Sequence, residues 1–152
     1  MTERELTLFR QKFTGFVFQS YNLIPSLTAL ENVAMPLMFK GVGKQEREAR
    51  ALEMLRLVGL ENRKNHRPFE MSGGQQQRVG IARAFVSNPR VIFADEPTGN
   101  LDSETTKNVM QLVCGLVHEN NSTMILVTHD NGVAEFADKI ITIIDGKISN
   151  EN

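Results

Sequence analysis

Two short apolar runs, each closed by charged or polar residues, constrain the fold of this chain more than any other feature. Residues 91–94 are Val-Ile-Phe-Ala and lead into Asp95-Glu96, and residues 124–128 are Met-Ile-Leu-Val-Thr and lead into His129-Asp130. Unbroken apolar runs of this length are typical of strands that are buried on both faces of a parallel sheet. We therefore expect an α/β domain whose polar strand ends lie at one edge of the sheet.

The helices and strands expected around these runs alternate along the chain. Residues 13–19 are rich in strand formers, and Ser72 begins a capping box with Gln75 that predicts a helix to about Val86. The other expectations are a loop leading into a short helix over 20–36, a helix over 44–58, an apolar helical stripe over 109–117, a helical turn over 133–137 and a hairpin that turns at Asp145-Gly146. This alternation requires crossover connections, which give a parallel sheet. With 152 residues, the chain is expected to form one domain.

Composition excludes several classes of protein. The formal net charge is -1, which gives the whole molecule no attraction for nucleic acid or for an anionic membrane. Cys114 is the single cysteine, so no disulfide framework or thiolate metal cluster forms within one chain, and a reducing, cytoplasmic compartment is expected. The longest apolar stretches, such as residues 140–144, are far shorter than the roughly 20 residues that cross a bilayer. Any association with a membrane is therefore expected to be peripheral.

Two features carry residues that are suited to chemistry. An aspartate directly after an apolar strand, like Asp95, is typical of a magnesium ligand in phosphoryl-transfer enzymes, and Glu96 beside it could polarise an attacking water. The alternative is that both are helix-capping acids on a loop. The run Ser72-Gly73-Gly74-Gln75 presents consecutive backbone amides at a helix N-terminus, which suits an anion, or it is a tight loop before a well-capped helix. Neither feature alone decides between the two interpretations.

Five motifs follow one another in an order known from one family of ATPases. Residues 71–78, Met-Ser-Gly-Gly-Gln-Gln-Gln-Arg, resemble the signature motif of the ATP-binding cassette (ABC) ATPases, and residues 91–96 resemble the Walker B strand with its glutamate. Gln19 matches the Q-loop glutamine, residues 99–102 resemble the D-loop, and His129 matches the switch histidine. The runs 19–28 and 95–102 are most similar to the subgroup that serves lipoprotein release, macrolide export and related permeases.

The resemblance implies a fold and a set of partners. The fold is that of the P-loop NTPases, with a parallel sheet core and a helical subdomain. Residues 20–90 would include the helical subdomain and the signature, and residues 91–152 the RecA-like core with the Walker B strand, D-loop and switch histidine. In this family two cassettes meet head to tail, bind ATP between them and drive a transmembrane permease, so the chain would lie at the inner face of the cell membrane. No nucleic acid partner is implied.

The resemblance also implies roles for residues. Glu96 would polarise water, His129 would contact the γ-phosphate of ATP, and Asp95 and Gln19 would hold Mg²⁺ and the water network, so Gln19 counts with both the catalytic and the metal-binding residues. The residues implied to bind ATP are Ser72, Gly73, Gly74, Gln75 and Asp102. Met35, Met38 and Phe39 are either core residues or part of a groove that holds a cytoplasmic helix of the permease.

One departure from the family pattern changes the expectation for this chain alone. The family's phosphate loop, Gly-x-x-x-x-Gly-Lys-Ser/Thr, precedes the Q-loop glutamine, and no glycine of these 152 residues is followed by Lys-Ser or Lys-Thr. Since that loop supplies most contacts to the β- and γ-phosphates, we expect the C-terminal two-thirds of a cassette that binds ATP weakly or not at all by itself. The alternatives are a non-catalytic partner that lends its signature loop to a complete cassette, and a truncated product without function.

Overall fold

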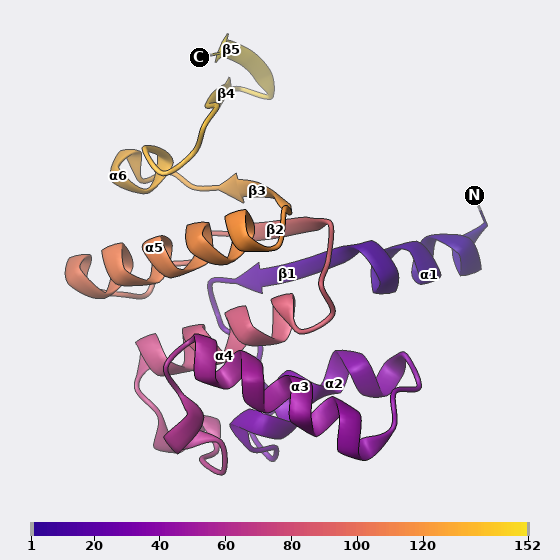
Figure 1. The fold of residues 1–152 in the computed structure, drawn as a ribbon. Coiled ribbons are helices and arrows are strands. Elements are labelled where there is room, and N and C mark those ends of the chain that lie inside the picture. Colours follow the sequence, from indigo (N-terminus) through magenta and orange to yellow (C-terminus); the bar gives the residue numbers. More distant parts are fainter. Residues whose placement is uncertain (1, 152) are drawn as a thin grey trace.

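A parallel sheet lies at the centre of the computed structural model, which describes residues 2–151. Its 3 strands are β1 (Thr14–Phe18), β2 (Val91–Asp95) and β3 (Thr123–Val127), in the order β1-β2-β3. Both pairs are parallel, and Phe18, Asp95 and Val127 are in register at the carboxyl end of the sheet (Figure 1). The expected α/β class with a parallel sheet is therefore confirmed.

Helices cover one face of this sheet. The helices α2 (Ala29–Phe39), α3 (Lys44–Leu57) and α4 (Gly73–Phe85) form a cluster, and α4 packs on β1 (Figure 1). Two short helices, η1 (Glu61–Arg63) and η2 (Pro68–Glu70), connect α3 to α4. The core joins this cluster to the sheet, because buried side chains of α4 belong to one hydrophobic cluster with Val17, Ile92 and Ala94.

The C-terminal third adds one long helix and a hairpin. The helix α5 (Ser103–Glu119) buries Val109, Met110, Val113 and Leu116, and the short helix α6 (Asn131–Ala134) follows β3. The antiparallel strands β4 (Ile141–Ile144) and β5 (Lys147–Glu151) form the expected hairpin, whose turn places Asp145 and Gly146 at φ 50 and 74. The hairpin stands away from the sheet in Figure 1. Within the part of the chain that the structure describes, no helix combines the length and the hydropathy that crossing a bilayer requires.

The expectation that the apolar strands are buried on both faces is wrong. Met124 and Leu126 of β3 pack against the core, but Ile125 and Val127, which point to the opposite face, are 47% and 56% exposed. On the same open face, Phe16 of β1 is 41% exposed. Within residues 2–151 these apolar side chains thus stay partly open to solvent, and β3, like β1, is an edge strand of the sheet. An apolar run alone does not reveal whether both of its faces find a partner.

Two helices begin or extend where the sequence interpretation had none or had a loop. The helix α1 (Glu3–Phe13) was not expected, although Thr2 and Glu5 form a capping box at its start. The segment expected as loop and short helix over 20–36 continues as α2 to Phe39, with Pro36 inside the helix. Asn32 is fully buried and fixes the preceding loop, since its Oδ1 accepts from the Ile24 amide at 2.8 Å. The turn expected over 133–137 begins at Asn131 instead.

Candidate functional site

The carboxyl ends of the three parallel strands bring the predicted catalytic residues to one edge of the sheet. Gln19 follows β1, Asp95 ends β2 and leads into Glu96, and His129 follows β3 after Thr128. The register of Phe18, Asp95 and Val127 places these segments side by side. Residues that are far apart in sequence therefore share one small region, at the position where parallel sheets bind ligands.

Two hydrogen bonds join Glu96 to His129 in this region. Glu96 Oε1 accepts hydrogen bonds from the backbone amide of His129 at 3.0 Å and from His129 Nδ1 at 2.7 Å. Glu96 Oε2 accepts a third hydrogen bond from Thr128 Oγ1 at 3.2 Å. The carboxylate is thus held by three donors from one segment, and Thr128 is a residue that the sequence interpretation missed.

The backbone sets the position of the Glu96 carboxylate. Glu96 has a φ of 45, and its amide donates to the carbonyl oxygen of Val127 at 2.9 Å. A non-glycine residue in this left-handed region costs about 1–3 kcal/mol and persists where surrounding contacts fix it. Here the contacts to Val127, Thr128 and His129 turn the side chain of Glu96 toward the end of β3.

The contact with Glu96 changes the acid–base behaviour of His129. The hydrogen bond and the charge of Glu96 raise the pKa of His129, with a smaller contribution from Asp130. A carboxylate only accepts hydrogen bonds, so Nδ1 carries the proton and Nε2 faces away from the pair. The His129 side chain is 85% exposed while that of Glu96 is 21% exposed, which leaves Nε2 open to a ligand from solvent.

The signature segment forms the predicted capping box. Ser72 is the N-cap of α4, its Oγ accepts from the Gln75 amide at 3.3 Å, and its own amide donates to Gln75 Oε1 at 3.0 Å. A Cβ added to Gly73 would lie 2.8 Å from Tyr21 Oη, and one added to Gly74 would lie 2.8 Å from Thr105 Cγ2. A side chain at either position would therefore displace a neighbouring side chain, and glycine avoids this while also suiting an anion.

Asp102, predicted to bind the nucleotide, has a structural role. It is the N-cap of α5, where its carboxylate accepts from the Thr105 amide at 3.0 Å and from Thr105 Oγ1 at 2.6 Å. These hydrogen bonds lower the pKa of Asp102. The side chain is exposed, so it remains accessible beside the signature segment that Thr105 touches.

The predicted metal ligands are only two side chains, the carboxylate of Asp95 and the carboxamide of Gln19. Asp95 is exposed at the end of β2, and Gln19 is exposed and hydrogen-bonded to Asn100. Among residues 2–151 there is no group of three or more His, Cys, Asp or Glu side chains that could hold a metal ion. Carboxylate and amide oxygens suit Mg²⁺, which usually takes one or two protein ligands and completes its shell with phosphate and water. The donor set thus fits Mg²⁺ whose remaining ligands would be phosphate and water oxygens.

The site residues fall into two groups that one side chain links. Glu96, Thr128 and His129 form the strand-end group, and residues 72–75 form the signature group; no hydrogen bond between these groups is found in the described part of the chain. Gln77 of α4 is completely buried and its Nε2 donates to the carbonyl oxygen of Pro97, directly after Glu96. A cavity of about 570 Å³ lies beside the strand-end group and is also lined by Lys107 of α5.

A comparison with protein families identifies the fold. The family model described as ABC transporter matches residues 1–99. The chain belongs to this family. The match covers the Q-loop glutamine, the signature and the Walker B strand, so the resemblance drawn from the motifs is confirmed.

Individual ABC proteins resemble the chain over almost its whole length. It is 51% identical over 148 residues to the uncharacterized ABC transporter ATP-binding protein MJ1508 of Methanocaldococcus jannaschii, covering 97% of this chain and 66% of that protein. It is 50% identical to the macrolide export ATP-binding/permease protein MacB of Neisseria gonorrhoeae, with 97% and 23% covered. It is 44% identical to the lipoprotein-releasing system ATP-binding protein LolD of Bacteroides thetaiotaomicron, with 99% and 69% covered. The predicted subgroup is therefore confirmed, and the chain spans about two thirds of the length of MJ1508.

Solved structures of an ABC cassette have the same fold. The dimeric structure of MJ0796, a bacterial ABC transporter cassette, superposes with a TM-score of 0.88 at 50% identity, covering 100% of this chain and 67% of that one. A dimeric post-hydrolysis state of MJ0796 bound to ADP and Pi superposes with a TM-score of 0.87 at 49% identity, with the same shares of each chain covered. The predicted ABC ATPase fold is thus confirmed.

Proposed function

We propose that this chain is part of the ATP-binding subunit of an ABC transporter, in which ATP hydrolysis drives a membrane permease. The observation that carries the proposal is the strand-end group, in which a glutamate directly after β2 is held by the histidine that follows β3. A carboxylate that orients water, beside a group that contacts the phosphate, promotes hydrolysis. Glu96 and His129 provide these two chemical groups.

Each predicted residue then has a role that the geometry supports. Glu96 would orient and polarise the attacking water, because its carboxylate is fixed by three donors. His129 would place Nε2 against the γ-phosphate, since Nδ1 is committed to Glu96. Asp95 and Gln19 would offer oxygens to Mg²⁺, which neutralises phosphate charge when bound.

The signature group serves a second nucleotide-binding surface. The free amides at the N-terminus of α4 favour an anion, and the Gly73-Gly74 pair lets a phosphate approach them. Asp102 lies near this segment through its contact with Thr105, which touches Gly74. We propose that residues 72–75 and Asp102 face the ATP of a second ABC subunit in a head-to-tail dimer.

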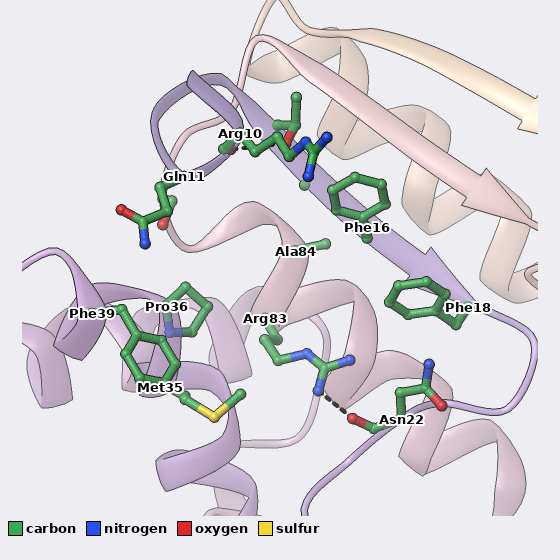
Figure 2. A pocket seen from close by; sticks show the side chains of 13 residues that line it. Arg10, Gln11, Phe16, Phe18, Asn22, Met35, Pro36, Phe39, Arg83 and Ala84 are labelled. Carbon is green, nitrogen blue, oxygen red and sulfur yellow. Dashed lines mark hydrogen bonds between the residues drawn. The ribbon is translucent and has the colours of Figure 1, made fainter. Parts of the chain in front are cut away.

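A groove beside β1 supplies a surface for the permease. A cavity of about 360 Å³ is formed between α1, β1, α2 and α4, and it is lined by Phe16, Phe18, Met35, Pro36 and Phe39 (Figure 2). Met38, which was grouped with Met35 and Phe39 in the sequence, is 47% exposed and does not line it.

The charges of this groove indicate the chemistry of its partner. Two cationic residues, Arg10 and Arg83, line the groove with no aspartate or glutamate among the lining residues. Arg83 is largely withdrawn from solvent, and this burial lowers the pKa of its guanidinium. A cytoplasmic helix of the permease with an apolar face and an acidic residue would match the groove. The chain would then lie in the cytoplasm at the inner face of the membrane.

The proposed division of the chain follows the arrangement of its helices. Residues 20–90 would carry the helical subdomain with the signature, and residues 91–152 the RecA-like core with the Walker B strand, D-loop and switch histidine. Support comes from the cluster of α2, α3 and α4 on one side and from β2, α5 and β3 on the other.

Complementation tests the proposal. None of the 152 residues forms the family's phosphate loop, so the chain would be mixed with a polypeptide that carries such a loop, and ATP hydrolysis would be measured for the mixture and for each component. We expect the mixture to hydrolyse ATP and neither component to do so by itself. If the mixture binds ATP, and hydrolysis depends on a glutamate of the partner and does not depend on Glu96, the chain is a donor of the signature loop. If no mixture of this kind binds or hydrolyses ATP, the proposal fails.

A further inference from the structure

We propose that Asn100 is a positioning residue for Gln19: it holds the carboxamide nitrogen of Gln19 on the D-loop and leaves the carboxamide oxygen available. The significance of that oxygen for Mg²⁺ rests on the proposed function. The two residues are 81 positions apart in the sequence, and both are exposed. Without a partner, an exposed glutamine side chain samples many rotamers, so a contact that fixes it has a consequence for the site.

Two hydrogen bonds join the residues in both directions. Asn100 Nδ2 donates to the backbone carbonyl oxygen of Gln19 at 3.1 Å. Gln19 Nε2 donates to Asn100 Oδ1 at 3.4 Å, which is a longer contact. The backbone and the side chain of Gln19 are therefore both held by one side chain of the D-loop.

The chemistry of the carbonyl fixes the orientation of both amides. The Gln19 carbonyl oxygen only accepts, so the NH₂ group of Asn100 must face it. Asn100 Oδ1 is then on the other side, and because this oxygen also only accepts, it must meet the NH₂ group of Gln19. Gln19 Oε1 is left without a hydrogen-bond partner among the described residues. Amide oxygen is the end of this side chain that binds a hard cation.

The backbone of the D-loop lies in close contact with the side chain of Gln19. A Cβ added to Gly99 would lie 2.6 Å from Gln19 Nε2 and 3.1 Å from its Cδ, so the carboxamide packs directly on the glycine backbone. Gly99 is in turn fixed relative to the strand-end group, because its amide donates to the carbonyl oxygen of Glu96 at 3.1 Å. Asn100 and Gly99 together thus set the place of Gln19 with respect to Glu96.

The backbone beyond Gln19 is fixed by a different residue. Arg83 of α4 donates to the carbonyl oxygens of Tyr21 at 2.9 Å and Asn22 at 2.5 Å. The Q-loop therefore keeps an anchor when Asn100 is removed. We expect the loss of Asn100 to free the Gln19 side chain and to leave the fold intact.

Nuclear magnetic resonance relaxation of the ¹⁵N-labelled chain measures this effect without ATP. The order parameter of the Gln19 side-chain amide should be close to that of a rigid backbone, about 0.85, and should fall below about 0.6 in Asn100→Ala. Asn65→Ala is the matched control, since Asn65 is exposed in the loop between η1 and η2. It should leave the Gln19 amide ordered.

Two further variants separate positioning from a general loss of structure. Gly99→Ala should free the Gln19 amide with Asn100 still present, because the new methyl group would occupy the position of the Gln19 carboxamide. Asn100→Asp keeps an acceptor for Gln19 Nε2 and loses the donor to the backbone carbonyl oxygen of Gln19. It should therefore give an intermediate order parameter for the Gln19 amide. It replaces Asn100→Ala as the test if Asn100→Ala does not fold.

The outcome is independent of whether the proposed function is correct. A Gln19 amide that is already mobile in the unmodified chain, or one that is equally ordered in Asn100→Ala, overturns the inference even where the complemented mixture hydrolyses ATP. An ordered Gln19 that Asn100→Ala releases, together with no hydrolysis in any complemented mixture, supports the inference and removes the proposed function.

Discussion

The contact between the signature segment and α5 gives a prediction whose size follows from the structure. Replacing Gly74 by alanine would place a methyl group 2.8 Å from Thr105 Cγ2. Thr105 cannot rotate away freely, because its hydroxyl donates to Asp102 at 2.6 Å and so secures the N-cap of α5. The new methyl group must therefore displace α4 from α5 or break the cap.

Two opposing effects set the magnitude. Alanine in place of glycine in a helix gains up to about 1 kcal/mol, whereas overpacking at a fixed neighbour costs about 1–3 kcal/mol. We expect Gly74→Ala to lower the free energy of unfolding by about 1 kcal/mol net. For a domain of this size that lowers Tm by about 2–4 °C.

A double-mutant cycle isolates the contact. Thr105→Ser removes the methyl group that clashes and keeps the hydroxyl that caps α5, so Gly74→Ala in that background should be neutral or stabilising. The four chains would be compared by urea unfolding followed by circular dichroism. Equal destabilisation by Gly74→Ala in both backgrounds would show that the contact with Thr105 is not what requires glycine at this position.

Three further predictions concern the site and the sheet. Titration of His129 by NMR should show a raised pKa that returns toward about 6.5 in Glu96→Gln. Because the folded-state pKa is raised, the stabilisation from this pair is complete below about pH 6.5 and is lost as the pH rises through the raised pKa. An unchanged pKa of His129 in the variant would refute the pairing. Residues 124–127 should exchange amide hydrogens faster than α4, and the purified chain should tend to aggregate, because β3 is an edge strand with an exposed apolar face. A soluble monomer with strong protection from exchange along residues 125–127 would contradict this. Calorimetric titration of the 152-residue chain with Mg-ATP should show weak or no binding, and micromolar affinity would contradict the importance given to the phosphate loop.

Local signals in the sequence predict the local structure well. Ser72 and Gln75 determine the start of α4 through a capping box, and the Asp145-Gly146 pair determines the hairpin because both residues adopt a positive φ. The same capping pattern at Thr2 and Glu5 marks α1, so this helix could have been predicted from a signal that was present but not used.

The features that the sequence does not reveal depend on residues that are distant along the chain. The exposure of Ile125 depends on which elements cover the sheet and not on the residues of β3. The pairing of Glu96 with His129 requires the register between β2 and β3, and the contact of Gln19 with Asn100 requires the path of the D-loop. The motif order places these residues in one site, but only the structure shows which atoms meet.

Replacement of Glu96 decides whether its carboxylate takes part in ATP hydrolysis. In the complemented mixture, Glu96→Gln keeps the shape of the side chain and removes its charge, so ATP hydrolysis should fall about 100-fold or more while ATP binding is retained. Glu119→Gln, at the exposed end of α5, is the matched control and should retain full hydrolysis. Hydrolysis that is unchanged in Glu96→Gln would contradict the account, because the carboxylate held by His129 would then have no part in the reaction.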